Sequence, residues 1–480
     1  MTNRTARSVV AALACAVVLA GCPTGANSPD NARPPRAQKW YDRALAEYHV
    51  AHLEGAYDSA RHALDLVPGD EQVRVLTAQV ALARLEYDEV LRLLRGIDSS
   101  TASALRGRAY WYQGELDRAA DELDKLLADP EVTDKWAKSI TKLARRGVGR
   151  KPFEITTTEG RLAVVQLARV APGIPLYIVP LEIDGDKALA LVSTGTAEVM
   201  VDGATRREPS WISLRFGRRL EVKDVPALTQ DLSGISHQLG APIKALLGAN
   251  LLRHLNVTLD HKGRQFVARS FVPPPPPVAS RVDVHYLRGG GMVLGSAFGE
   301  GDGQRASLFV DSGMGHSLAL DEGGWKKLGI EAGTLPLANG SGDPKLRVGS
   351  IPLLQLGAFK LPQIPAVFGP PIDQVERELD IDVDGVVGAG LLSKFRLTLS
   401  DQGRVLWVEQ TPAVTPVPAG PLPLGPLPTE PMQPGLPAAI GPGALPGGGP
   451  VPMLPPISDN PLSPIPPPPE LPESGGKKNF

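Results

Sequence analysis

The stretch Leu246-Leu-Gly-Ala-Asn-Leu-Leu252 returns later in the chain as Val386-Val-Gly-Ala-Gly-Leu-Leu392. Two residues after each copy comes an alternating segment, Leu255-Asn-Val-Thr-Leu-Asp260 in one case and Phe395-Arg-Leu-Thr-Leu-Ser400 in the other, and then a Gly-Arg pair. The order and the spacing are the same, so the chain contains an internal duplication. Copies about 140 residues apart are too distant for a solenoid and predict two similar lobes.

Each copy also has an apolar strand that ends in a small polar turn. In the second copy the strand and its turn are Leu308-Phe-Val-Asp311-Ser312-Gly313. In the first copy the apolar run Leu189 to Val192 leads into Ser193-Thr194-Gly195. Period-two alternation with glycine turns continues through both segments and favours β-sheet. We therefore expect two β lobes, residues 150–271 and 281–409, joined by a Pro-rich linker at residues 272–280.

An apolar strand ending in Asp-Ser/Thr-Gly, with the Gly-Ala-x-Leu-Leu element further along the same copy, resembles the lobes of pepsin- and retropepsin-like aspartic proteases. The resemblance covers about residues 173–409 and implies two lobes whose strand-end turns meet at the floor of a cleft. In that family two aspartates share one proton there, so their apparent pKa values split and the pair acts as general base and general acid. Two unrelated β domains with a chance Asp-Ser-Gly are the alternative.

The resemblance is carried over residue by residue. Asp311 takes the catalytic aspartate position of lobe 2, with Ser312-Gly313 beside it, and Thr194-Gly195 fills the matching places in lobe 1. The catalytic position of lobe 1, however, is held by Ser193. A serine hydroxyl neither shares a proton with Asp311 nor repels its charge, so the split in pKa should disappear and the rate should fall by several orders of magnitude. His316, close to the second turn, is expected either to line the cleft or to have a supporting or surface role.

The start of the chain is typical of a lipoprotein export signal, residues 1–21. A basic beginning precedes the apolar run Val9 to Leu19, which is too short for a stable membrane span, and Leu19-Ala20-Gly21-Cys22 follows. This tetrapeptide resembles the lipobox of bacterial lipoproteins, which implies acylation of Cys22 by fatty acids such as palmitate. An ordinary secretory signal with a chance cysteine is the alternative. The lipobox places the protein in the cell envelope, held by the Cys22 lipid to a membrane. Pro23 is not the Asp of inner-membrane retention and favours the outer membrane, on its periplasmic side or surface.

Cysteine content and composition exclude several function classes. Cys15 would leave with the signal and Cys22 would carry the lipid, so no thiol remains for a cysteine protease, a zinc–thiolate site or an iron–sulfur cluster. A net charge of -2 and 5% aromatic residues argue against a nucleic-acid partner. No phosphate loop or dinucleotide fingerprint lies in a strand–helix context, so we expect no cofactor. No carboxylate cluster accompanies His49, His52 and His62, which we interpret as a solvated helix face and not as a metal site.

After a tether at residues 22–36, residues 37–146 are rich in Ala, Leu, Glu and Arg with helical periodicity. Three segments look alike: Leu53-Glu-Gly55-Ala-Tyr57, Leu85-Glu-Tyr87 and Gln113-Gly114-Glu-Leu116. Their spacing of about 30 resembles tetratricopeptide (TPR) repeats, in which glycine gives the turn between antiparallel helices. A generic helical bundle is the alternative, because the spacing is uneven and the middle segment lacks the glycine. Stacked helix pairs of this kind offer a surface for a protein partner.

Residues 410–480 are mostly Pro, Gly and Leu without period, and we expect them to be disordered or polyproline II. The predicted fold class is multidomain α + β. Antiparallel TPR-like helical repeats come first, a two-lobed all-β aspartic-protease-like domain follows, and the disordered Pro-rich tail ends the chain.

Three functions fit this organisation. The first is a cell-envelope lipoprotein that binds a peptide or protein ligand in its cleft, with catalysis impaired by Ser193. The second is an active aspartic endopeptidase in which two molecules pair to form an Asp311–Asp311 dyad. The third is a non-enzymatic assembly lipoprotein, in which the repeats bind partners and the lobes are spacers. The sequence favours the first over an active monomer and leaves open whether the chain is an enzyme.

The lipobox hypothesis makes a direct prediction. Cells grown with a labelled fatty-acid precursor should label the wild-type protein, and Cys22→Ser should abolish both the label and the partition into detergent, because the acyl chains supply the membrane affinity. Labelling that survives Cys22→Ser would contradict the assignment.

Overall fold

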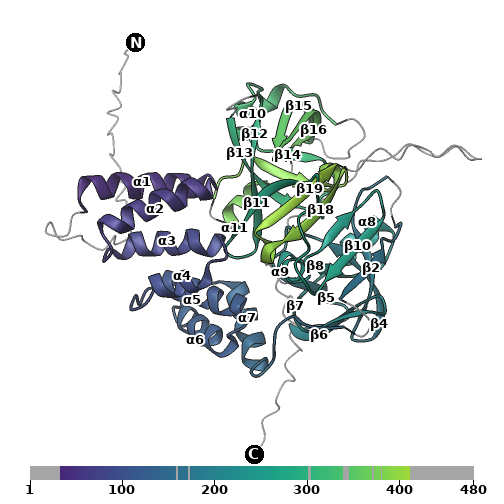
Figure 1. Ribbon diagram of the computed structural model, residues 1–480, viewed down its shortest axis with the longest axis horizontal. Coiled ribbons are helices and arrows are strands. Elements are labelled where there is room, and N and C mark those ends of the chain that lie inside the picture. The colour runs from purple at the N-terminus through teal and green to yellow at the C-terminus, as the bar shows by residue number, and fades with distance from the viewer. Residues whose placement is uncertain are drawn as a thin grey trace, which may run out of the picture.

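The computed structural model describes residues 33–157, 161–170, 173–300, 304–338, 345–369, 372–379 and 381–410. A helical region comes first and two β-rich lobes follow it, which confirms this part of the predicted fold class (Figure 1). The export signal with Cys22, and all but the first residue of the predicted disordered tail, lie outside the described residues and stay predictions. Within these ranges, no helix combines the length and the apolar character that crossing a membrane requires.

The helical region stacks its helices in chain order, each against the next. They are α1 (Pro35–His49), α2 (Leu53–Leu66), α3 (Glu71–Ala83), α4 (Tyr87–Leu93), α5 (Ser100–Gln113), α6 (Leu116–Leu127) and α7 (Lys135–Arg146). Three of them start at a capping side chain, because Asp70, Ser99 and Asp134 each accept a hydrogen bond from the backbone N–H three residues on.

The same turn recurs inside the pairs α1–α2, α3–α4 and α5–α6. Ala51, Leu85 and Gly114 all have left-handed backbone, with φ of 53°, 62° and 82°. The N–H that follows each of them donates to a carbonyl five residues back. The repeat is therefore structural, although only the third turn uses the glycine expected there. Gly55 lies inside α2, where an added Cβ would meet the Glu47 carboxylate at 2.9 Å. Membership in the TPR family stays a prediction.

Lobe 1 is a closed ring of six strands. The ring order is β3–β4–β8–β5–β7–β6, and β6 closes it by pairing with β3, while β1 adds to the outside of β7. The strands are β1 (Glu154–Thr157), β3 (Ile178–Ile183), β4 (Asp186–Val192), β5 (Val199–Asp202), β6 (Ser210–Phe216), β7 (Leu220–Gln230) and β8 (Ile243–Leu247). Two short helices, α8 (Ser233–Leu239) and α9 (Ala249–His254), flank β8.

Lobe 2 repeats this ring as β12–β13–β17–β14–β16–β15. The same positions are parallel in both lobes, β4 with β8 and β5 with β7 in the first, β13 with β17 and β14 with β16 in the second. The strands are β12 (Gly291–Phe298), β13 (Gln304–Asp311), β14 (Leu318–Leu320), β15 (Arg347–Leu356), β16 (Phe359–Phe368) and β17 (Gly385–Gly388). Its helices are α10 (Glu322–Lys327), η2 (Ala332–Thr334), α11 (Ile372–Leu379) and α12 (Ala389–Leu392).

A further sheet joins the lobes in the order β2–β10–β9–β18–β19–β11, and β11 continues into β12. Its strands are β2 (Leu162–Gln166), β9 (Thr258–Asp260), β10 (Gln265–Arg269), β11 (Ser280–Leu287), β18 (Phe395–Ser400) and β19 (Val405–Gln410), with η3 (Asp401–Gly403) between the last two. At its centre Thr258 pairs with Thr398, and their buried hydroxyls lie 2.8 Å apart. These residues match each other in the duplicated sequence, so the pseudo-twofold axis passes between them.

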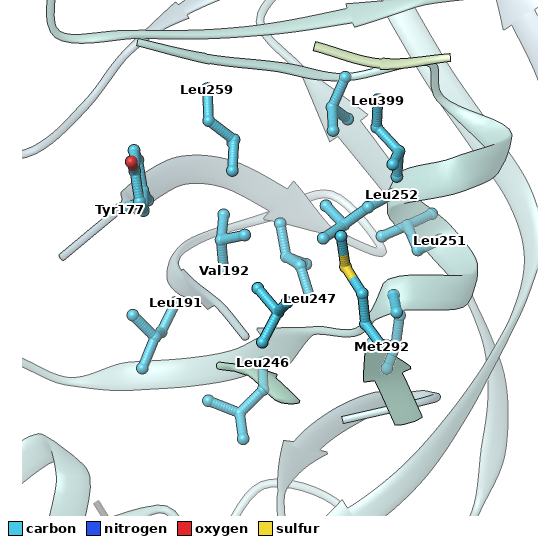
Figure 2. Close-up of a cluster of buried hydrophobic side chains, with 14 of the residues drawn as sticks. Tyr177, Leu191, Val192, Leu246, Leu247, Leu251, Leu252, Leu259, Met292 and Leu399 are labelled. Carbon is cyan, nitrogen blue, oxygen red and sulfur yellow. The ribbon is translucent and has the colours of Figure 1, made fainter. Parts of the chain in front are cut away.

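The leucines of the duplicated element form the core that surrounds this axis on the lobe 1 side. Figure 2 shows Leu246 and Leu247 of β8 and Leu251 and Leu252 of α9 facing the other apolar side chains of the cluster. Met292 of lobe 2 enters the same cluster, so the two lobes share one apolar core. The element is repeated because each lobe needs the same buried face next to its strand-end turn.

The paired threonines give a stability prediction. Thr398→Val removes the hydroxyl partner of Thr258, yet Thr258 still accepts from the Arg269 guanidinium at 2.8 Å, so we expect a loss of about 1 kcal/mol. Thr258→Val removes the hydroxyl partner of Thr398 and one of the two acceptors of Arg269, which keeps the Asn256 carbonyl at 3.0 Å, and should cost more, about 1–3 kcal/mol. Urea unfolding of the two variants measures the difference. Equal losses would mean that Thr258 does not link the two contacts.

Candidate functional site

The site lies where β4 and β13 end. The structure brings together the two residues that the sequence comparison set in equivalent places, because the Ser193 hydroxyl donates to Oδ1 of Asp311 at 3.4 Å. Each strand is held by a parallel neighbour from its own lobe, β8 or β17, which fixes the direction in which the turn leaves the sheet. The catalytic role of these residues stays a prediction.

Four hydrogen bonds that involve the hydroxyls of Thr194 and Ser312 lock the two turns together. The Thr194 hydroxyl accepts from the Ser312 N–H at 3.0 Å and donates to the Val310 carbonyl at 2.8 Å. The Ser312 hydroxyl accepts from the Thr194 N–H at 3.1 Å and donates to the Val192 carbonyl at 2.8 Å. The exchange is reciprocal and buried, with Ser312 at 0% and Thr194 at 6% exposure. Both hydroxyls thus use a donor and an acceptor from the opposite lobe.

Glycine is required at the turns because the backbones approach closely. An added Cβ at Gly195 would lie 2.7 Å from the Asp311 carboxyl carbon, so only glycine leaves room for that carboxylate. The glycines of the duplicated element, Gly248 and Gly388, lie against the loops that follow the turns. A Cβ there would meet backbone carbonyl oxygens at 2.1 and 2.4 Å. This contact explains why each turn and its Gly-Ala element occur together in the sequence.

Asp311 is an isolated carboxyl with a raised pKa. Burial raises the pKa above its usual value, and three donors oppose the rise without cancelling it. They are the Gly313 N–H, 2.8 Å from Oδ1, the Ser193 hydroxyl and the Gly195 N–H. No carboxylate stands at position 193, so Asp311 has no carboxyl partner there with which to share a proton.

A cavity of about 550 Å³ opens above Asp311. Both lobes line it, and so does the helical region through residues of α5 and of the segment that leads into α7. The sequence predicted a cleft between two lobes and gave no sign of this third wall. No periodic pattern in the sequence marks this wall, because the residues that form it are isolated side chains on their helices.

Glu198 is a second acid on this cavity that sequence reasoning missed. It is 2% exposed, and burial raises the pKa of its carboxyl. The Trp111 indole N–H of α5 donates to Oε1 at 3.2 Å. Glu198 interrupts an otherwise apolar run just after the Ser193 turn. A charged residue in such a run was the one feature of the sequence that could have indicated a buried acid. Asp311 and Glu198 do not form a pair of interacting carboxyl groups. Asp311 accepts a hydrogen bond from Ser193, and Glu198 accepts one from Trp111.

The predicted histidines lie apart from this site. His316 does not line the cavity, and burial lowers the pKa of its imidazole. His62 packs against the Trp40 ring with centroids 4.6 Å apart, and His52 lines a different pocket. Over the described ranges, His, Cys, Asp and Glu side chains nowhere gather in threes in a way that would hold a metal ion.

Comparisons with known proteins add little to this geometry. No protein-family model matches the chain, and no curated protein matches it either. Among solved structures, a retropepsin-like aspartic protease from Rickettsia conorii is similar, with 16% identity and a TM-score of 0.21. The match covers 27% of this chain and 91% of that chain. A likeness of this size carries no argument about activity, which rests on the contacts described above.

The raised pKa of Asp311 sets the sign of a pH effect. A carboxyl whose pKa is higher in the folded than in the unfolded chain stabilises the fold while protonated, and this contribution is lost as the pH rises through the folded pKa. Asp311→Asn is neutral at every pH, so it should melt at a higher temperature than the wild type at pH 7, and the gap should close at low pH. Thermal melts from pH 3 to 8 test this, with Asp186→Asn, at an exposed carboxyl of β4, as the control. A lower melting temperature at pH 7 would contradict it.

Proposed function

We propose that the chain is an aspartic-protease-like, peptide-binding lipoprotein of the cell envelope whose catalytic machinery is impaired. The observation that carries this proposal is the contact of Ser193 with Asp311 inside a pair of turns locked by reciprocal hydrogen bonds. The scaffold that would hold two aspartates is complete, and one aspartate is absent.

The chemistry of peptide hydrolysis explains the impairment. A water that attacks a peptide carbonyl needs a base to take its proton and an acid to protonate the carbonyl oxygen. Asp311 can serve as one of these at a time, while the Ser193 hydroxyl has no acidity in the useful range and stabilises little developing charge. The cavity nevertheless keeps apolar walls beside a few polar groups, which is the lining that binds an extended peptide.

A homodimeric protease with an Asp311–Asp311 pair is the second candidate, and the geometry disfavours it. Such a pair needs the Ser312 turn of one molecule to meet the Ser312 turn of another. In this chain the Ser312 N–H, the Ser312 hydroxyl and the Val310 carbonyl are already bonded to Thr194. The two lobes would have to separate, and their shared core and sheet would have to break, before two molecules could pair in this way.

The assembly function, in which the helical repeats bind a protein partner, is confined to one face of the helical region. Its helices α1–α3 share an apolar core with lobe 2, and α5–α7 share one with lobe 1. One face of the helical layer is therefore occupied by the lobes of the same chain. We propose that a protein partner of the repeats, if the repeats take one, binds the opposite face, while the Cys22 lipid holds the molecule at a membrane.

Restoring the missing acid tests the proposal. The wild-type chain should bind peptides without appreciable cleavage, and Ser193→Asp should give measurable cleavage with an acid optimum. The new carboxylate at position 193 would face Asp311. The Gly313 N–H would lie beside it as the Gly195 N–H lies beside Asp311. Two adjacent carboxyl groups share a proton, so their apparent pKa values should split. Peptide digestion followed by mass spectrometry, together with a pH–rate profile, measures both effects.

The controls separate catalysis from folding. Asn has the size of Asp without its charge, so Ser193→Asn should bind peptides but not cleave them. The double variant Ser193→Asp with Asp311→Asn should lose the cleavage activity that Ser193→Asp alone gains. Efficient cleavage by the wild type, abolished by Asp311→Asn, would show that catalysis is not impaired. Absence of peptide binding by the wild-type chain would reject the function itself.

A further inference from the structure

The helical region forms part of the cavity. Arg108 and Tyr112 of α5, together with Asp134 and Trp136 at the start of α7, face the same space as Asp311. Any ligand large enough to fill the cavity and reach Asp311 therefore also meets the helices. This is a property of the whole chain and not of either lobe alone.

The wall is fixed in place by specific contacts. Nη1 of Arg108 donates to the Arg288 carbonyl of lobe 2 at 3.2 Å, and the Trp111 indole donates to Glu198 of lobe 1 at 3.2 Å. The Tyr112 ring lies on the backbone of Gly289, where an added Cβ would be 2.1 Å from a ring carbon. Helix α5 thus touches both lobes beside the cavity, and it cannot move away from the cavity without breaking these contacts.

The cavity combines an apolar interior with cationic groups. Its interior is lined by lobe 2 side chains such as Phe309, Met314 and Val375. Three arginines stand around it, namely Arg108, Arg288 and Arg377. Three acids line the same cavity. Burial raises the pKa of Glu198 and of Asp311, which favours their neutral forms, while Asp134 caps α7 and forms an ion pair with Arg108. The cavity therefore holds cationic groups beside an apolar interior.

Arg108 is the best placed of these cations to select a ligand. Its guanidinium stacks on the Trp136 ring, 3.8 Å from the centroid, which fixes the plane of the fork. The carboxylate of Asp134 lies 3.6 Å from Nη2, too long for a good hydrogen bond. A planar guanidinium with five donors matches the two oxygens of a carboxylate.

We propose that the cavity selects peptides that present a carboxylate beside an apolar residue, and that Arg108 of the helical region is the residue that selects it. The proposal rests on the peptide-binding function proposed above. The apolar residue fills the lobe 2 side of the cavity, and the carboxylate reaches the guanidinium on the helical side. The carboxylate comes either from an Asp or Glu side chain or from the C-terminus of the peptide.

Four fluorescent peptides that differ in charge test the proposal by polarisation. They share an apolar sequence and carry Glu, Gln or Lys at one position with an amidated C-terminus, or Gln with a free C-terminal carboxylate. The wild-type chain should bind a carboxylate peptide about tenfold or more tightly than the Gln amide, and the Lys peptide most weakly. A preference for Glu assigns the side-chain source, and a preference for the free C-terminus assigns the terminal source.

Variants at position 108 assign the selectivity to its residue. Arg108→Gln should remove the preference while apolar binding remains, and Arg108→Glu should reverse it in favour of Lys. Arg118→Glu makes the same charge change at an exposed site on α6 and should keep the wild-type preference. Circular dichroism checks the fold of each variant, and if Arg108→Glu fails to fold, Arg108→Gln and the salt dependence of wild-type binding decide.

The outcomes separate this inference from the proposed function. Equal binding of all four peptides by the wild type would overturn the carboxylate selection and leave peptide binding intact. A preference that persists in Arg108→Gln would overturn the role of Arg108. Binding of none of the peptides would reject the proposed function, and the inference with it.

Discussion

The exchange of hydrogen bonds between Thr194 and Ser312 is the constraint on which the rest of the structure depends. Each hydroxyl accepts an N–H and donates to a carbonyl of the opposite lobe, so neither turn is satisfied alone. Buried polar groups left unpaired cost about 1–3 kcal/mol each, which makes separation of the turns unfavourable. The turn geometry in turn fixes Ser193 opposite Asp311, whose carboxyl lines the cavity.

The helical region extends this constraint to the whole chain. Its first helices complete the core of lobe 2 and its last helices that of lobe 1, so the helical region bridges the lobes (Figure 1). Residues of α5 and α7 also line the cavity. A bridge of this kind resists hinge motion between the lobes, because opening the cavity would expose apolar surface at both ends. The cavity is therefore preorganised, which lowers the entropic cost of ordering a ligand.

The sequence predicted the site better than its surroundings, and the reason is physical. The turn and the Gly-Ala element are local patterns set by close backbone contacts, so their duplication was enough to pair Ser193 with Asp311. The docking of the helices depends on scattered side chains such as Arg108 and Trp111, whose partners are distant in the chain and leave no periodic trace. The helix turn at Leu85 is a second feature that local sequence patterns do not predict. Leucine disfavours a positive φ, and tertiary packing holds the buried Leu85 in this conformation.

The two copies differ at positions of lobe 1 that lie beside α4 and α5. Arg253 of lobe 1 corresponds to Ser393 of lobe 2, and it is buried, donating to the Tyr87 hydroxyl at 2.5 Å. Its guanidinium also lies 5.3 Å from the Tyr112 ring centroid. In the same way Asn250 stands where lobe 2 has Gly390. Lobe 1 thus differs from lobe 2 at these positions beside the helices, as it does at the strand-end turn, where Ser193 stands in the place that Asp311 takes in lobe 2.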